Sequence, residues 1–294
     1  MMIKRQLGKT NMYVSPIGLG CMGFSHAYGL AEDKERAIQT IKQAYKMGYN
    51  FFDTAECYTG ENTDGTISYN EELVGEALKE VREQVVIATK FGVEHKGDHL
   101  ELDSSPEKIY ASIEGSLKKL QTDYIDLYYQ HRIDPKVEPE VVAGVMKELI
   151  AAGKIKAWGI SETTEEYLRR AHAVCPVTAI QNRYSMMARW YEDLFVVCKE
   201  LGITYVAFSP MANGLLSGKF TPDSTFEKGD FRNNMPQYQK EGYESKKIIE
   251  FVKSIIRKEK LYYGSTFNSM DAKKKGFYCA YPGKQKIRTF RRKF

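Results

Sequence analysis

The fold is decided by the stretch "QVVIATKFG" (residues 84–92), "SPEKIYASIEGSLKKL" (105–120) and "YIDLYYQH" (124–131). The two outer runs are short, continuous and rich in Val, Ile, Phe and Tyr, which is typical of strands buried on both faces of a parallel sheet. The middle run follows Ser104 and Ser105 and begins at Pro106, a typical helix start. This stretch therefore predicts a strand, a helix and a second strand parallel to the first.

The same alternation continues on both sides of this stretch. Predicted strands fall at 15–20, 49–54, 155–161, 177–185 and 203–210, and predicted helices at 70–81, 138–153, 164–174, 190–202 and 244–260. Gly153 and Gly202 stand where two of these helices should end. Counting from 15–20 gives seven strand-then-helix units, and one more would close a (β/α)₈ TIM barrel. A doubly wound sheet has the same periodicity, so the pattern alone leaves both α/β folds open.

The ends of the chain differ from this pattern. Residues 4–15 predict a short hairpin before the first strand, placed to plug the bottom of a barrel. Because repeats and low-complexity linkers are lacking, we expect one domain over residues 1–294. From Arg257 onward there are twelve basic residues against two acidic ones, although the whole chain carries only +5. Such a basic end could bind nucleic acid, an alternative that we rank last.

Composition excludes several classes of protein. The start has no apolar segment of a secretory signal, and no apolar run approaches the ~18 residues of a membrane span. The five cysteines are an odd number without the spacing of metal ligands. They are typical of free thiols in a reducing cytosol. We therefore expect a cytoplasmic protein without a metal, a membrane partner or a nucleic-acid partner.

The segment "GLGCMG" (18–23) matches the G-x-G-x-x-G fingerprint of a dinucleotide-binding turn. That fingerprint needs a helix directly after it and an acidic residue about twenty positions on, at the end of a second strand. Here no helical pattern begins before about Asp33, and both Asp33 and Glu35 open that later helix. A glycine-rich loop between a strand and a helix explains the segment better than a Rossmann turn.

Four chemically active residues stand where predicted strands end: Asp53 and Tyr58 in "FFDTAECYTG", Lys90 in "IATKFG", and His131 in "YYQHR". Singly, each has an ordinary explanation: a cap, a loop aromatic, a solvated charge and a core histidine. Together they lie at the ends of three consecutive strands, which converge on one face of a barrel. The sequence therefore predicts an active site there.

These four residues together support one kind of chemistry. A free Tyr hydroxyl has a pKa near 10. A nearby Lys ammonium lowers that pKa, and a carboxylate holds the ammonium charged. A His facing the same pocket can hydrogen-bond a carbonyl oxygen. Such a site can polarise a C=O bond and protonate its oxygen, and a nicotinamide cofactor is implied as the source of hydride.

Several motifs together resemble one known family. They are, in order, "GLGCMGF", "GYNFFDTAECY", "ATKFG", "YIDLYYQHR", "GKIKAWGIS", "IQNRYS" and "FSPMANGLLSGK". Over residues 4–258 the chain is similar to the aldo-keto reductase superfamily, most of all to its bacterial and plant general oxidoreductases. The resemblance implies a TIM barrel with NADPH bound extended and without a Rossmann domain. It places "GLGCMG" at the end of the first barrel strand, near the nicotinamide.

The resemblance also implies individual roles. Tyr58 would donate the proton, Lys90 and Asp53 would tune its pKa, and His131 would orient the carbonyl group. The carboxamide and the nicotinamide ring would be held by Ser161, Gln181 and the stacked ring of Tyr184. The pyrophosphate loop would comprise Ser209, Pro210, Met211, Asn213, Gly214, Leu216, Gly218 and Lys219. The substrate mouth would be lined by Cys21, Met22, Phe24 and Cys57.

The chain departs from the family pattern in two places. Many members have Asn after the carboxamide serine, whereas Glu162 stands here, and a carboxylate cannot donate to an amide oxygen. Residues 259–294 form an atypical basic tail, of which only "GFYCAYPGKQK" (276–286) resembles the eighth strand and its turn. The basic residues Lys284, Lys286 and Arg288 of this tail are available for the 2′-phosphate. We expect a truncated or disrupted eighth unit, lower stability and weaker cofactor binding, with a frameshifted source gene as the hypothesis.

The function expected from the sequence is NADPH-dependent reduction of aldehydes or ketones to alcohols, with small carbonyl or alcohol substrates. Two alternatives remain: a cofactor-sensing regulatory protein on the same fold, and an inactive product of a frameshifted gene. The physiological substrate, the preference for NADPH over NADH and the oligomeric state do not follow from one sequence.

Overall fold

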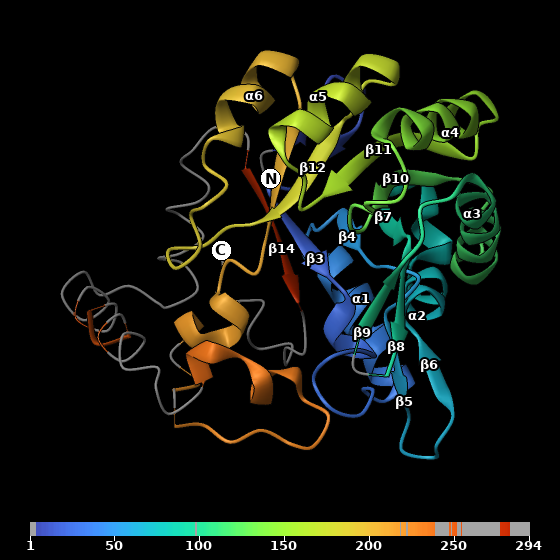
Figure 1. Cartoon of the computed structure of the whole chain (residues 1–294). Coiled ribbons are helices and arrows are strands. Elements are labelled where there is room, and N and C mark those ends of the chain that lie inside the picture. The colour runs from blue at the N-terminus through green and yellow to red at the C-terminus, as the bar shows by residue number, and fades with distance from the viewer. Residues whose placement is uncertain are drawn as a thin grey trace.

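Eight parallel strands form a closed barrel (Figure 1). A computed structural model of the chain describes residues 4–97, 99–217, 219–221, 223–238, 247, 249–251 and 254, and the backbone of the strand at 277–282. In barrel order the strands are β3 (Ile17–Gly20), β4 (Phe51–Asp53), β7 (Val86–Phe91), β10 (Ile125–Gln130), β11 (Ile155–Ser161), β12 (Ala179–Arg183), β13 (Thr204–Phe208) and β14 (Phe277–Pro282). The TIM barrel is confirmed, and the doubly wound sheet is excluded.

The strand β14 closes the barrel between β13 and β3. Its backbone pairs Tyr205 with Phe277 on one side and Ile17 with Cys279 on the other, both in parallel. The eighth strand predicted from "GFYCAYPGKQK" is therefore confirmed. The rest of the tail, including Lys284, Lys286 and Arg288, lies outside the described residues.

Helices cover the outside of the barrel, each following its strand (Figure 1). They are α1 (Lys34–Lys46), α2 (Asn70–Leu78) continued by the 3₁₀ helix η2 (Lys79–Gln84), α3 (Pro106–Leu120), α4 (Pro139–Ala151), α5 (Glu165–Val174) and α6 (Leu194–Leu201). Of the seventh helix predicted at 244–260, residues 247, 249–251 and 254 are described, and all are helical. No helix of the described part of the chain is long and apolar enough to cross a membrane.

Side-chain caps start several of these helices. The carboxylate of Asp33 accepts a hydrogen bond from the Arg36 amide, and the Ser105 hydroxyl accepts one from the Lys108 amide. Each satisfies a backbone donor that has no partner within the helix. Asp33 therefore opens α1, as the sequence predicts, and does not end a second Rossmann strand.

The described part of the chain also has three antiparallel hairpins outside the barrel sheet. They pair β1 (Arg5–Gln6) with β2 (Tyr13–Val14), β5 (Thr59–Glu61) with β6 (Ile67–Tyr69), and β8 (Val93–Lys96) with β9 (His99–Leu102). Leu7 and Val14 of the first hairpin are fully buried in one cluster with Leu127 and Val206 of the barrel strands. This hairpin plugs the barrel, as the sequence predicts.

Between strands and helices lies the larger core. Trp158, Tyr128 and Phe52 are fully buried in it. Gly159 allows β11 its close contacts, because a Cβ there would lie 2.4 Å from both the Ala179 carbonyl oxygen and the Tyr129 ring. The tight packing fixes the carboxyl ends of the strands relative to one another.

Candidate active site

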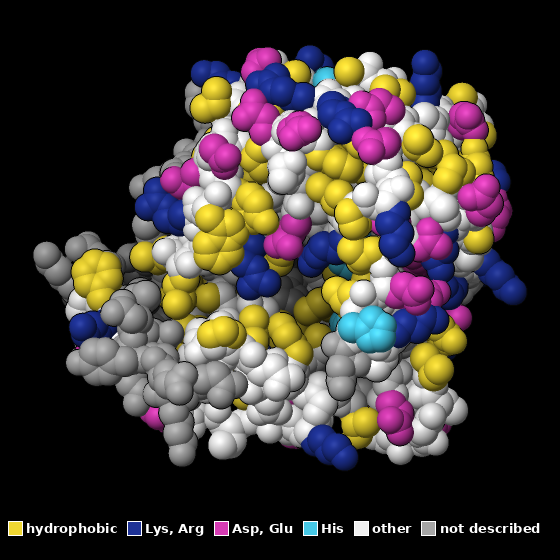
Figure 2. Space-filling view, viewed as in Figure 1, with side chains coloured by type: hydrophobic (Ala, Val, Ile, Leu, Met, Phe, Trp, Pro, Cys, Tyr) yellow, Lys and Arg dark blue, Asp and Glu magenta, His cyan; other side chains and the backbone are white. Residues whose placement is uncertain are grey.

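A pocket of about 200 Å³ lies at the carboxyl ends of the strands. Figure 2 shows this face of the molecule hollowed, with hydrophobic side chains around the opening. The lining residues are Gly20, Met22, His26, Asp53, Cys57, Tyr58, Val93, His95, Leu100, His131, Arg132, Ser161, Gln181, Arg183, Phe208, Ser209, Asn213 and Phe231. Three of the four predicted catalytic residues line it, and the fourth, Lys90, contacts two of them.

The buried ammonium of Lys90 organises the floor of the pocket. Its Nζ donates to Asp53 Oδ1 at 2.5 Å, to the Thr54 carbonyl oxygen at 2.7 Å and to the Tyr58 hydroxyl oxygen at 3.4 Å. The other carboxylate oxygen of Asp53 accepts from Gln181 Nε2 at 2.7 Å. Burial alone would lower the pKa of Lys90, but the negative charge of Asp53 and the Tyr58 oxygen outweigh it, so the pKa is raised. Lys90 is therefore charged at neutral pH.

The pKa of Tyr58 differs from the sequence-based expectation. Burial raises it to about 12, while the charge of Lys90 acts in the opposite direction. The predicted effect of Lys90 is present, but the net lowering that we expected is wrong, because burial is the larger effect. At neutral pH Tyr58 keeps its proton, and its oxygen accepts from Lys90. This arrangement leaves the hydroxyl proton for donation to a ligand in the pocket.

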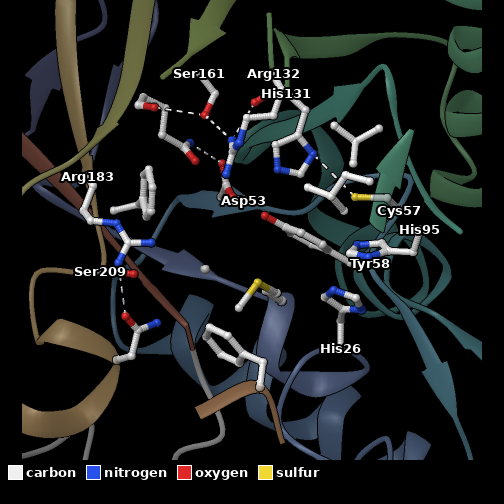
Figure 3. Close-up of a pocket in the computed structure, with 18 residues that line it drawn as sticks. His26, Asp53, Cys57, Tyr58, His95, His131, Arg132, Ser161, Arg183 and Ser209 are labelled. Atoms are coloured by element: carbon white, nitrogen blue, oxygen red, sulfur yellow. Dashed lines mark hydrogen bonds between the residues drawn. The ribbon is translucent and has the colours of Figure 1, made fainter. Parts of the chain in front are cut away.

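His131 lies edge-on to Tyr58, with ring centroids 5.6 Å apart. Burial, reinforced by the charges of Lys90 and Arg132, lowers the pKa of His131 well below its ordinary value, so the ring is neutral. Its Nδ1 is 3.4 Å from Cys57 Sγ, and burial raises the pKa of this thiol to about 12. When the protonated thiol donates to Nδ1, the proton of the neutral ring lies on Nε2. In this tautomer the imidazole can donate from Nε2 to an oxygen. Figure 3 shows His131 beside Cys57 and Tyr58.

Ser161 and Gln181 meet at the pocket wall. Ser161 Oγ donates to the Gln181 carbonyl oxygen at 3.0 Å and accepts from Arg132 Nη1 at 3.1 Å. The unexpected Glu162 has a left-handed backbone, with φ of +53°, and its carboxylate lies 3.7 Å from Arg132 Nε. Glu162 is thus a charge partner of Arg132 and is not itself among the lining residues.

Tyr184, expected to stack on the nicotinamide, is buried away from the pocket. Its ring packs edge-on against Phe195 and Tyr205, and its hydroxyl donates to Glu192. Phe208, the last residue of β13, lines the pocket instead. The sequence contains a signal for Phe208, because it lies within the strand predicted at 203–210 and directly before the predicted 209–219 loop.

The predicted pyrophosphate loop begins in the left-handed backbone region. The φ angles are +52° at Ser209, +46° at Ala212, +56° at Asn213 and +104° at Gly214. Left-handed turns of this kind can direct successive backbone N–H groups towards an anion. Gly214 is also restricted by close packing, because a Cβ there would lie 2.9 Å from the Phe220 ring.

The other residues of this loop lie further from the pocket. Leu216 is buried in a cluster with Tyr238, and Met211 packs against the same cluster. The Lys219 ammonium lies over the Phe220 ring. Pro210 is buried next to Ser209, and Gly218 lies outside the described residues. Of the predicted loop residues that the structure describes, Ser209 and Asn213 line the pocket.

Of the four residues predicted for the substrate mouth, Met22 and Cys57 line the pocket. Cys21 and Phe24 are buried in the main core, so their assignment is wrong. Successive strand residues point to opposite faces, and Cys21 continues the outward face of Leu19.

Four lining residues with basic side chains were missed: His26, His95, Arg132 and Arg183. His26 and His95 are neighbours, with ring centroids 4.6 Å apart, and His26 Nδ1 lies 2.8 Å from the Thr59 carbonyl oxygen. Their only sequence signal is their place in segments that follow predicted strands. In the described ranges, no group of three His, Cys, Asp or Glu side chains could hold a metal ion.

Comparison with known proteins identifies the family of the chain. Residues 16–264 match the Aldo/keto reductase family. The chain is 39% identical to Probable aldo-keto reductase 1 of Glycine max over 257 residues, which are 86% of this chain and 72% of that protein.

Two solved structures share the fold. The glycerol dehydrogenase AKR11B4 from Gluconobacter oxydans is 25% identical, with a TM-score of 0.83 over 95% of this chain and 86% of that chain. The aldo-keto reductase AKR11C1 from Bacillus halodurans, in its holo form, is 26% identical, with a TM-score of 0.77 over 100% and 90%. With the barrel, the pocket and these likenesses in agreement, the chain belongs to the aldo/keto reductase family of oxidoreductases.

Proposed function

We propose that this protein reduces aldehydes or ketones to alcohols with NADP(H), and that Tyr58 is the proton donor. The observation that carries the proposal is the buried contact of Lys90 with both Asp53 and the Tyr58 hydroxyl oxygen. A protonated phenol at the floor of a pocket, beside a neutral imidazole, is suited to protonate a carbonyl oxygen.

The pocket residues fit a nicotinamide dinucleotide. Ser161 and Gln181 present polar groups beside Asp53, and the Phe208 ring offers an aromatic surface. The left-handed residues Ser209, Ala212, Asn213 and Gly214 and the guanidinium of Arg183 form a polar region suited to phosphate. When bound there, the nicotinamide would supply hydride to the carbonyl carbon. The preference for NADPH over NADH is proposed from the family resemblance.

The chain's own groups then handle the substrate oxygen. The carbonyl oxygen accepts hydrogen bonds from the Tyr58 hydroxyl and from His131 Nε2, which polarises the C=O bond. As the carbonyl carbon gains hydride, the phenolic proton passes to the oxygen and the alcohol forms. The resulting phenolate is stabilised by the Lys90 ammonium, which Asp53 holds in place.

A cytoplasmic location is part of the proposal. Cys21, Cys57, Cys175 and Cys198 are all free and buried. Free thiols are typical of a reducing compartment.

The test is a fluorescence titration of the protein with NADPH and NADH, followed by absorbance at 340 nm with an aromatic aldehyde. We expect saturable binding and turnover, and a loss of about 10²–10⁴-fold in kcat for Tyr58→Phe, because that variant has no acidic proton. NADPH affinity should change little in the variant. Equal turnover by Tyr58→Phe would exclude Tyr58 as the donor, and a folded protein that binds neither nucleotide would refute the function.

A further inference from the structure

Arg183 is a half-buried cation at the pocket wall, at the end of β12. Its Nη1 lies 3.5 Å from Asn213 Oδ1, and its guanidinium lies 5.2 Å from the centre of the Phe208 ring. Both of these contacts are to neutral groups. No ion pair with a carboxylate forms at Arg183 within the described part of the chain.

The other cations at this site are neutralised. Lys90 is paired with Asp53, and Arg132 lies near the carboxylate of Glu162. A partly desolvated charge without a partner is unfavourable, so residues of this kind usually meet an opposite charge in the functional state. Arg183 points into the pocket near Ser209 (Figure 3). An anionic ligand would supply the missing charge.

A second observation points to the same ligand. Three residues other than glycine, Ser209, Ala212 and Asn213, adopt left-handed φ angles within five positions. Each such residue costs free energy, and clusters of them occur at ligand sites. Because Asn213 carries the side chain that contacts Arg183, the strained backbone and the unpaired cation belong to one region.

We propose that Arg183 binds the diphosphate of the dinucleotide, at the phosphate next to the nicotinamide riboside. This rests on the proposed function. Arg183 lies two residues after Gln181, whose amide contacts Asp53, so the two side chains leave the same face of β12. The phosphate nearest the nicotinamide is therefore the one within reach. A guanidinium can hold it with two parallel hydrogen bonds.

The diphosphate is common to NADPH and NADH. Arg183 should therefore strengthen the binding of both by the same factor and leave the preference between them unchanged. A residue that contacts the 2′-phosphate would act on NADPH alone. This difference separates Arg183 from the basic tail residues proposed for that phosphate.

The experiment measures dissociation constants for NADPH, NADH, reduced nicotinamide mononucleotide and adenosine 2′,5′-bisphosphate, by fluorescence or calorimetry at low salt. The variants are Arg183→Met, which keeps an unbranched apolar stem, and Arg183→Lys, which keeps the positive charge but lacks the planar guanidinium. Arg189→Met is the matched control, because Arg189 is exposed and pairs with Glu192 on the same segment. Circular dichroism checks that every variant is folded.

For Arg183→Met we expect the dissociation constants of NADPH, NADH and the mononucleotide to rise about tenfold to hundredfold, with Arg183→Lys in between. Adenosine 2′,5′-bisphosphate, which lacks the diphosphate, and the Arg189→Met control should be unchanged. Equal affinity in Arg183→Met, or a loss confined to NADPH, would each overturn the proposal. Wild-type protein that binds no dinucleotide would refute the proposed function and this inference together.

Discussion

Replacing Asp53 by Asn should expose how strongly the site depends on its buried charge pair. Asn has the size of Asp and can still accept from Lys90, but it has no charge. The Lys90 side chain is 0% exposed and that of Asp53 is 6% exposed, so solvent cannot compensate. The remaining contacts of the ammonium would be the Thr54 carbonyl oxygen and the Tyr58 hydroxyl, both neutral.

The magnitude follows from burying one charge without its partner. Removing one member of a buried ion pair typically costs about 3–5 kcal/mol. Whole domains are stable by only about 5–15 kcal/mol, so Asp53→Asn should remove a large share of the stability. Lys90→Met leaves Asp53 with only Gln181 and should cost a similar amount. The double variant removes both charges and should be less destabilised than the sum of the single variants.

The direction in which stability changes with pH is an independent test of this argument. In the wild type the pKa of Lys90 is raised, so its stabilisation is present below the ordinary Lys pKa and is lost as pH rises through the raised value. In Asp53→Asn the charge of Asp53 no longer opposes burial, so we expect burial to lower the pKa of Lys90. The unfolded state then binds more protons, and stability should recover as pH rises from 7 towards 10.

Urea unfolding followed by circular dichroism at pH 7 and pH 9.5 measures all of these quantities. A cost of less than about 1 kcal/mol for Asp53→Asn would refute the argument, because that is the range of exposed pairs. Strict additivity of the two substitutions, or no recovery at high pH, would also refute it.

Two further predictions concern packing and proton transfer. Gly159→Ala should destabilise the protein by about 1–3 kcal/mol, because its Cβ would lie 2.4 Å from the Ala179 oxygen and the Tyr129 ring. Gly144→Ala, in α4 with open space around it, should be neutral or stabilising by up to about 1 kcal/mol, so equal melting temperatures for both variants would contradict this. Oxidation of an alcohol requires the phenolate of Tyr58, whose pKa is about 12, so kcat/KM should rise about tenfold per pH unit from pH 6 to 9. A plateau near pH 7 in that profile would mean that another group accepts the proton.

The periodic signal predicted an α/β fold, either a TIM barrel or a doubly wound sheet, and the family resemblance favoured the barrel. Short apolar runs alternate with capped helical segments, and the carboxyl ends of parallel strands must converge. That rule alone brought Asp53, Tyr58, Lys90 and His131 to one pocket. The strand β14 could be found inside an atypical tail because "GFYCAYP" keeps the composition of a buried strand.

Residues facing the pocket could have been predicted better from the alternation of the strands. In β12, Gln181 and Arg183 lie two apart and both line the pocket, whereas Tyr184 leaves on the other face. In β13, Val206 is packed inside the barrel, so Phe208, two residues on, faces the same interior. The family resemblance favoured Tyr184, although the alternation of side chains along the strands favoured Phe208. His26 and His95 obey no such rule, since their neighbourhood depends on loop conformation.

The pKa of Tyr58 shows a different limit. From the sequence, a lysine beside a tyrosine predicts a lowered pKa, and that effect is present. Its size relative to burial depends on how completely the neighbours exclude water, which only the packed structure determines. Burial is the larger effect, so the phenol keeps its proton near neutral pH, and Lys90 acts by stabilising the phenolate as the proton leaves. The same residues in a more open pocket would favour the phenolate, so the direction of proton transfer is set by packing as much as by the four catalytic groups.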